Sequence, residues 1–339
     1  MADETILGGY GTEEEKAFET SLRPSSFEEF VGQSQIKENL GIYIRAAAER
    51  GDALDHILFS GPPGLGKTTL AYIIAGELGT RITVTSGPIL ERAGDLAGIL
   101  TNLEYGDVLF IDEIHRISAA VEEYLYAAME DFAIDILLDQ GPSARSVRLD
   151  LKRFTLIGAT TREGLLTSPL RARFGVMEKL DFYPAEDIAL ILERNAGKLD
   201  VQLDEEGCRV VSERARGTPR VANRFLRRLR DVAQVKGNNV ITQAIALDGL
   251  GMLGVDEHGL GSMDRRILEA VVRHGGGPVG VKTIAVSVDE TEDTVENVYE
   301  PYLIQQGYIT KTPRGRVLTE AAYRVLGQAP PAGGQQRIF

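Results

Sequence analysis

Short apolar runs alternate with stretches of helical spacing through the first half of the chain. A short continuous apolar run is typical of a strand buried on both faces, whereas residues 35–50 have the spacing of an amphipathic helix. Alternating strands and helices predict an α/β fold with a parallel sheet, helices on both of its faces, and ligand sites at the carboxyl ends of its strands. The apolar runs are Ile57 to Phe59, Ile82 to Val84, Val108 to Ile111, Phe154 to Ile157 and Leu180 to Phe182.

The second half of the chain has a mainly helical pattern. Helices are expected at residues 185–196, 204–215 and 219–236, and again at 263–274 and 281–286. A further helix is expected to be capped by Asp289 and Glu290 and to end at Gln306. Strands at 308–311 and 317–319 would then flank a basic turn. Three helices followed by a two-stranded turn form the layout of a winged helix, a module that binds DNA in some proteins and protein in others.

These patterns divide the chain into three folded domains between two tails. The polar, acidic residues 1–20 are expected to form a loose tail, and residues 329–339 a second one. A large sheet domain is predicted at 21–184, a small helical domain at 185–256 and the winged helix at 257–328.

Residues 134–149 interrupt the alternation of strands and helices. Two arms with β propensity flank Gly141 and Pro142, which predicts a hairpin. A hairpin that projects from a sheet domain either holds a partner or is a decoration. Apolar residues in its arms favour the partner.

A glycine-rich loop follows the first predicted strand. Gly61, Gly66, Lys67 and Thr68 fit the spacing G-x-x-x-x-G-K-[ST], whose backbone N–H groups surround phosphate oxygens at the positive end of a helix. Lys67 is expected to neutralise the β and γ phosphates, and the Thr68 hydroxyl to bind Mg²⁺. A plain glycine turn that caps a helix is the alternative, but the strand before the loop and the helix after it favour ATP with Mg²⁺.

Polar residues end two further predicted strands. Asp112 and Glu113 follow a buried run, and adjacent carboxylates there suit a metal-dependent ATPase, with Asp112 near the metal and Glu113 as the base that activates water. Solvated acids at a strand end are the alternative, which the phosphate loop upstream disfavours. Thr160 and Thr161 follow the next run, and Thr161 is preferred as the residue that contacts the γ-phosphate or the water.

Arginines follow the sheet region in two places. Arg171 and Arg173, in a short helix that begins at Ser168, lie two residues apart and so point differently; one is expected to pair within its own subunit and the other to project outward. Arg220 lies in the first turn of a helix, where a cation opposes the helix dipole unless an anion binds it. A basic helix face without a ligand is the alternative for Arg220.

Composition narrows the class of protein. The 339 residues are 43% hydrophobic, which supports folded cores, and Cys208 is the only cysteine, which excludes an internal disulfide and suits a reducing compartment. Without a signal peptide or a long apolar run, the expected location is the cytoplasm. A net charge of −13 argues against nucleic acid, but residues 262–326 are nearly neutral and end in Lys311, Arg314 and Arg316.

These motifs, in this order, resemble those of the AAA+ ATPases, and more closely those of the RuvB family of bacterial Holliday-junction branch-migration motors. The resemblance covers about residues 20 to 327 and extends to segments outside the ATPase motifs. They include Leu22-Arg23-Pro24, Phe30-Val31-Gly32-Gln33, residues 51–56, Thr85-Ser86-Gly87-Pro88, residues 110–116, residues 158–162 and residues 311–316.

The resemblance implies a nucleotide held between a large ATPase domain and a small lid domain. Asp112 and Glu113 match the metal and water residues, Thr161 the first sensor, Arg173 the arginine finger given to the neighbouring subunit, and Arg220 the second sensor. The nucleotide loop matches at Gly64, Lys67, Thr68 and Thr69, and the adenine side at Leu22, Arg23 and Tyr183. Glu130, Asp131 and Phe132 match a segment near the neighbour's nucleotide, and because acids repel phosphate we interpret them as organising the finger.

The resemblance also implies partners. The winged-helix head would contact DNA through Lys311, Arg314 and Arg316, and the hairpin at 134–149 would bind the junction-recognising protein RuvA. The subunits would form a homo-oligomeric ring, expected to be a hexamer, that moves duplex DNA at a four-way junction. A protein-remodelling or loading switch, whose winged helix binds protein, is the alternative. The basic wing favours the DNA motor.

Overall fold

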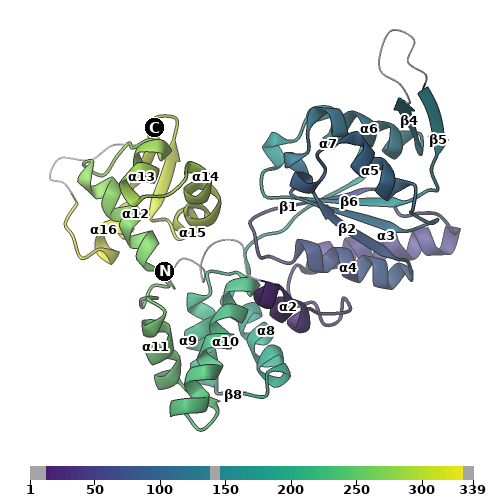
Figure 1. The fold of residues 1–339 in the computed structure, drawn as a ribbon. Helices are drawn as coiled ribbons and strands as arrows, with labels where there is room; N and C mark the ends of the chain where they lie inside the picture. The colour runs from purple at the N-terminus through teal and green to yellow at the C-terminus, as the bar shows by residue number, and fades with distance from the viewer. Residues whose placement is uncertain (1–12, 138–145, 331–339) are drawn as a thin grey trace. The chain divides into compact units, whose positions relative to one another are not determined.

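The computed structural model describes residues 13–137 and 146–330 (Figure 1). The chain separates into two compact units. Residues 23–181 form one, and the residues up to Leu22 join those from Phe182 onward in the other. In these described ranges no helix is both long enough and apolar enough to cross a membrane.

A parallel sheet forms the centre of the unit 23–181. Its strand order in the described residues is β2-β3-β6-β1-β7, and all neighbouring strands run parallel. Because β1, β3 and β6 lie inside the sheet and are covered on both faces, they are almost entirely buried, which explains their continuous apolar runs. The strands are β1 Ile57–Ser60, β2 Ile82–Ser86, β3 Val108–Asp112, β6 Thr155–Thr160 and β7 Val176–Lys179.

The last predicted strand was placed wrongly. The structure has β7 at Val176–Lys179, and the apolar run Leu180 to Phe182 follows it; Leu180 only donates one more hydrogen bond to Ser60 O, at 2.9 Å. An edge strand is less buried than an inner one, so β7 alternates partly buried and exposed residues, including Glu178 and Lys179, and gives no apolar run.

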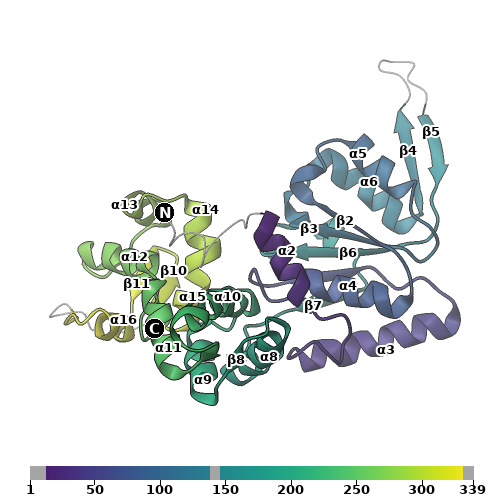
Figure 2. The ribbon, with the colours of Figure 1, turned by 60° about the horizontal axis from the view of Figure 1, so that its bottom comes forward.

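Helices cover both faces of this sheet (Figures 1 and 2). On one face lie α3 Ser34–Arg50 and α4 Lys67–Leu78. On the other lie α5 Ala93–Leu100, α6 Ala119–Glu130 and the short α7 Ser168–Arg171. Leu96 and Leu125 from these helices are fully buried in one cluster with Leu109 and Phe154 from the sheet region. The short 3-10 turns are Gly87–Ile89, Ile114–Arg116 and Glu163–Leu165.

The predicted hairpin arms are confirmed. Strands β4 Ala133–Leu137 and β5 Ser146–Asp150 pair antiparallel, with Ala133 opposite Asp150. The turn predicted at Gly141 and Pro142 lies outside the described residues. Figure 2 shows both arms extending away from the helices that cover the sheet.

The second unit begins with a helical lid. Its helices are α8 Ala185–Lys198, α9 Glu205–Arg214, α10 Pro219–Lys236 and α11 Gln243–Met252, with a short parallel pair between β8 Gln202–Leu203 and β9 Val240–Ile241. The sequence reading missed α11 because its small residues give little amphipathic pattern. A Cβ at Gly249 would approach Leu229 to 2.3 Å, so this glycine allows α11 to pack closely against α10.

The prediction that residues 1–20 form a loose tail was wrong for residues 13–20. Residues Glu13–Leu22 form helix α2, and residues 1–12 lie outside the described range. Leu22 is buried, its carbonyl accepts a hydrogen bond from Arg194 at 3.3 Å, and the Arg227 guanidinium lies 4.8 Å from the Phe18 ring centroid. Contacts with the lid therefore order a polar segment that composition alone marks as loose.

The head has the predicted winged-helix layout. Helix α12 Ser262–Arg273 and α13 Val281–Val288 precede a long helical segment, and β10 Ile309–Thr312 pairs antiparallel with β11 Gly315–Leu318. The long segment comprises α14 Glu292–Thr294, a π turn Val295–Tyr299 and α15 Glu300–Gln305, and α16 Glu320–Val325 follows the wing. The N-cap of the long segment is Thr291, whose side chain accepts from Thr294 N, rather than the predicted Asp289 or Glu290. Asp289 instead ends α13, with its backbone in the left-handed region.

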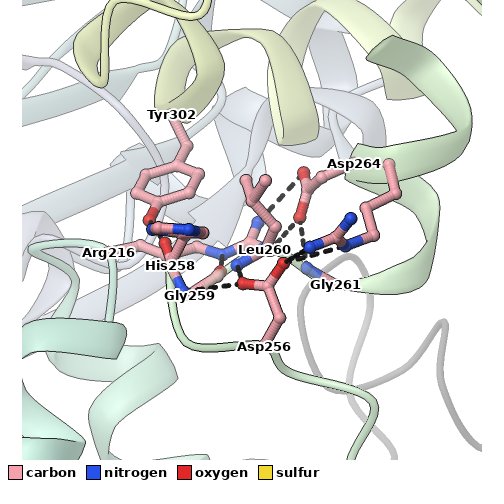
Figure 3. Close-up of polar contacts among 9 residues, drawn as sticks. Arg216, Asp256, His258, Gly259, Leu260, Gly261, Asp264 and Tyr302 are labelled. Atoms are coloured by element: carbon pink, nitrogen blue, oxygen red, sulfur yellow. Dashed lines mark hydrogen bonds and ion pairs between the residues drawn. The ribbon is translucent and has the colours of Figure 1, made fainter. Parts of the chain in front are cut away.

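A buried ion pair joins the lid to the head (Figure 3). Arg216, in the loop before α10, is hydrogen-bonded to Asp264 in α12, and their side chains are only 4% and 0% exposed. The Arg216 guanidinium also lies 4.6 Å from the Tyr302 ring centroid, and its Nε donates to Gly259 O at 3.2 Å. Asp264 accepts from Gly261 N at 2.8 Å, so the carboxylate caps α12 as well.

Candidate functional site

The glycine loop has a backbone that only glycine adopts easily. Gly61, Gly64 and Gly66 have φ values of 130°, 80° and 105°, in the left-handed region. A Cβ at Gly61 would come within 2.4 Å of Leu180 O. Gly66 precedes α4 and no side chain caps that helix, so its first N–H groups face the loop as an anion site would require.

Lys67 is the first residue of α4, followed by Thr68 and Thr69 in its first turn. The Lys67 side chain is 7% exposed, and its Nζ donates to Gly61 O at 2.7 Å and to Pro62 O at 2.8 Å. A buried ammonium needs such partners. The loop therefore folds around the amine and places positive charge beside the helix N-terminus.

The two predicted carboxylates lie at the carboxyl edge of the same sheet. Asp112 ends β3, and its Oδ1 accepts from Glu113 N at 2.9 Å. Glu113 has a φ of 47°, an uncommon value for a residue with a side chain. Since β1 and β6 are neighbours and β6 also pairs with β3, the loop after β1 and the acids after β3 share one edge.

The structure brings Thr161 rather than Thr160 to the predicted base. Thr161 Oγ1 donates to Glu113 Oε2 at 3.1 Å. Thr160 is buried and its Oγ1 lies 2.9 Å from His115 Nδ1, which in turn lies 3.2 Å from Glu113 Oε2. His115 was missed as a neighbour of the base, although its position two residues after Glu113 was a usable signal. Its ring connects the ends of β3 and β6.

Arg173 pairs within its own chain. Its Nη2 donates to Glu130 Oε2 at 2.8 Å and its Nη1 to Pro169 O at 2.8 Å. Its guanidinium carbon lies 4.4 Å from the ring centroid of Tyr126, a residue that the sequence reading missed. Glu130 is therefore the carboxylate that holds Arg173 within its own chain.

The rest of the segment Glu130 to Phe132 faces other neighbours. Asp131 lies 3.8 Å from Arg148 of the hairpin, between Oδ2 and Nη2. Phe132 has a φ of 49° and packs edge-on against Phe154, with ring centroids 5.9 Å apart. Asp131 thus faces the hairpin strand β5, and Phe132 packs against the residue that precedes β6.

Comparison with known proteins decides the family. Family models described as the RuvB P-loop domain, the RuvB AAA lid domain and the RuvB C-terminal winged-helix domain match residues 22–180, 183–256 and 257–327. The Holliday junction branch migration complex subunit RuvB of Myxococcus xanthus is 59% identical over 327 residues, 96% of this chain and 95% of that protein. The chain belongs to the RuvB family.

Solved structures agree with this assignment to the RuvB family. The RuvB Holliday junction branch migration motor of Thermotoga maritima is 48% identical, with a TM-score of 0.85 over 92% of this chain and 100% of that chain. A variant of the same RuvB gives 49% identity and a TM-score of 0.86 over 91% and 99%. The parallel-sheet P-loop domain, lid and winged helix are therefore the fold of this chain, and it is a nucleotide-binding member of the AAA+ class.

The remaining nucleotide residues expected from the RuvB family lie in both units. Arg23 belongs to the sheet unit, where its guanidinium lies 4.5 Å from the Tyr72 ring centroid. Leu22, Tyr183 and Arg220 belong to the lid unit, where Tyr183 N donates to Gly217 O at 2.9 Å. Arg220 Nε lies 3.2 Å from Glu19 Oε1, so a carboxylate of α2 is its anion in this structure.

The wing presents its basic residues unequally. Arg314 is exposed in the turn between β10 and β11. Lys311 is exposed but lies 3.2 Å from Glu296. Arg316 is only 7% exposed and donates to Glu300 and Glu296; burial opposes its charge, but these hydrogen bonds outweigh burial and raise its pKa. Two glutamates of the preceding helical segment therefore enclose Arg316, whereas Arg314 is open to solvent.

Proposed function

We propose that this chain is an ATP-driven motor that translocates duplex DNA and so moves the branch point of Holliday junctions. One observation carries the proposal: the glycine loop, Asp112 with Glu113, and Thr161 converge on one edge of a sheet in a chain that also has a winged helix. The relatives whose names state branch migration match this chain over nearly its whole length.

The residues present fit ATP with Mg²⁺. The positive φ values of Gly61, Gly64 and Gly66 and the uncapped start of α4 leave backbone donors for phosphate oxygens. The described residues contain no cluster of three or more His, Cys, Asp or Glu side chains that could hold a metal alone. Mg²⁺ typically binds through few protein groups together with substrate phosphates. Thr68 and Asp112 would hold it, and when bound it neutralises charge that develops on the phosphates.

The chain's own groups would divide the work of hydrolysis. Lys67, positioned by two loop carbonyls, would exchange them for the β and γ phosphates. Glu113 would orient the attacking water and accept its proton, and Thr161 would keep the Glu113 carboxylate aimed at that water. The lid would contribute Arg220 to the phosphates and Tyr183, with Leu22 and Arg23, to the adenine side.

A homo-oligomeric ring, expected to be a hexamer, would complete the site. Arg173 would reach the nucleotide of the neighbouring subunit and stabilise charge in the transition state, with Glu130, Asp131 and Phe132 organising it. The ion pair between Arg173 and Glu130 supports the organising role of this segment. A cytoplasmic location follows from the same role in DNA processing.

Two elements would bind the partners. The wing would contact duplex DNA through Arg314, assisted by Lys311 and braced by Arg316, because the first is exposed and the last is enclosed. The hairpin of β4 and β5 would bind the RuvA-type junction protein, and the exposed Val147 on its second arm supports a docking role.

The test measures ATP hydrolysis and branch migration together. We expect duplex DNA to stimulate ATP hydrolysis, and the chain with a RuvA protein to dissociate a synthetic four-way junction in an ATP-dependent way. A matched Glu113→Gln chain should bind the junction without dissociating it. ATP hydrolysis that ignores DNA, together with an intact junction, would contradict the motor and favour a protein-remodelling switch.

A further inference from the structure

Tyr126 forms a platform under Arg173. The guanidinium carbon of Arg173 lies 4.4 Å from the centroid of the Tyr126 ring, a geometry in which a cation is attracted to the ring face. Pro169 O and Glu130 Oε2 each accept from one terminal nitrogen of Arg173 at 2.8 Å. The ring fixes the plane of the guanidinium and the two acceptors fix its direction within that plane.

The Tyr126 ring is itself held in place. Its hydroxyl donates to Glu122 one turn earlier on α6 and lies 2.9 Å from Thr167 Oγ1. Thr167 also donates to Glu122 and accepts from Leu170 N at 3.3 Å, which makes it the cap of α7. Burial and the hydrogen bond to Glu122 raise the pKa of Tyr126, so the hydroxyl stays a neutral donor. The ring therefore connects α6 to the start of the segment that carries Arg173.

Arginine has a flexible stem, and a residue that acts across a subunit boundary must be aimed before the partner arrives. The Arg173 side chain is 21% exposed, and its neighbour Glu130 is 58% exposed, so the ion pair between them is open to water and weak by itself. The attraction between a cation and a ring face is stronger where solvent is excluded from the contact. Tyr126 is partly buried whereas Glu130 is exposed, so the ring is the better shielded of the two groups that contact the arginine.

We propose that Tyr126 is a positioning residue for the trans-acting arginine of the ring. It acts through Arg173, whose role across the subunit boundary rests on the proposed function. The ring face carries this role, and the hydroxyl tunes it by fixing the ring.

The first experiment compares three variants of the full-length chain. Tyr126→Leu removes the ring face and should lower kcat about tenfold with little change in KM for ATP, as expected for an interaction used in the transition state. Tyr126→Phe keeps the face and should stay within about threefold of the parent. Tyr124→Leu is the matched control: Tyr124 is also partly buried against the same core, but side chains two apart on a helix do not face the same neighbour, so kcat should be unchanged.

The second experiment separates positioning from damage to the fold. Tyr126→Leu subunits keep a good nucleotide site and lack an aimed arginine, whereas Lys67→Ala subunits lack the nucleotide site and keep the arginine. Mixed rings should therefore hydrolyse more ATP per Tyr126→Leu subunit than pure Tyr126→Leu rings do. In a double-mutant cycle, Tyr126→Leu should cost nothing further once Arg173 is alanine.

The outcomes distinguish the two proposals. If Arg173→Ala is rescued by Lys67→Ala subunits but Tyr126→Leu is not, or if the two substitutions multiply in the cycle, Tyr126 is not a positioning residue. If Arg173→Ala itself gains nothing from mixing, the trans role of Arg173 fails first. If Tyr126→Leu does not fold, Tyr126→Met, which also lacks a ring, takes its place in both experiments. A kcat of the ring-less variant equal to that of Tyr126→Phe would overturn the proposal.

Discussion

Lys67 and Glu113 lie on the same sheet edge but should serve different stages of ATP turnover. Lys67 supplies positive charge to phosphate in the ground state, so Lys67→Ala should abolish ATP binding. Glu113→Gln keeps the size of the side chain and its contact with Thr161 but cannot accept a proton, so binding should persist while turnover is lost. Nucleotide titration beside steady-state hydrolysis measures both. An equal loss of ATP affinity in the two variants would show that these roles are misassigned.

Arg173 should not be replaceable by another cation. Its two terminal nitrogens donate to acceptors on different elements, Glu130 and Pro169, which a single ammonium cannot do in the same geometry. Arg173→Lys should therefore lower kcat nearly as far as Arg173→Ala, on the order of 10³-fold, with ATP binding intact. Hydrolysis at saturating ATP gives the comparison. A lysine variant that keeps more than half of the parent rate would show that charge alone suffices.

At the scale of elements, the wing offers a matched pair of arginines. Arg314 is exposed, so Arg314→Ala should weaken binding to unrelated duplexes about equally and reduce the salt slope by roughly 1, without changing stability. Arg316→Ala would leave the buried carboxylate of Glu300, 3% exposed, without its main partner, and should cost about 3–5 kcal/mol of folding free energy. DNA titrations at several salt concentrations and chemical unfolding of both variants provide the measurements. The reverse pattern would mean that Arg316 is the phosphate contact.

The sequence was informative where one pattern has one physical cause. Buried inner strands, the glycine loop and the polar residues at strand ends could be predicted, because burial on both faces and positive φ values restrict residue choice. The edge strand β7 could not, since an edge strand carries charged residues such as Glu178. Helix α2 could not either, because it is ordered by tertiary contacts such as Arg227 with Phe18.

The candidate site shows the same division. Asp112, Glu113 and Thr161 were recognisable as strand-end residues, and the structure places them together. The role of Tyr126 and the burial of Arg316 could not be recognised from the sequence. Each depends on a residue of another element: Arg173 for Tyr126, and Glu300 for Arg316. Local sequence patterns identify charged residues, whereas only the packed structure shows which of these side chains remain exposed to solvent.

At the scale of the molecule, the ion pair between Arg216 and Asp264 should dominate the connection of lid to head. Asp264→Asn keeps an acceptor for Gly261 N but leaves the Arg216 charge buried without compensation, so it should cost about 3–5 kcal/mol. Adding Arg216→Met removes that charge and should restore part of the loss. Denaturant midpoints of the single and double variants test this. Strictly additive losses would show that the two side chains are not coupled.

This junction also bears on how the domains can be dissected. Arg216 lies four residues before Arg220, in a loop where Gly217 accepts from Tyr183 N. Cutting the chain before residue 257 to obtain an ATPase without its head would also delete Asp264 and Tyr302. The truncated lid would then expose an arginine that the intact chain buries, next to the helix that carries Arg220. Slow ATP hydrolysis by the truncated chain would then reflect the exposed Arg216 as well as the missing DNA contacts. The full-length Arg314→Ala variant is the cleaner comparison.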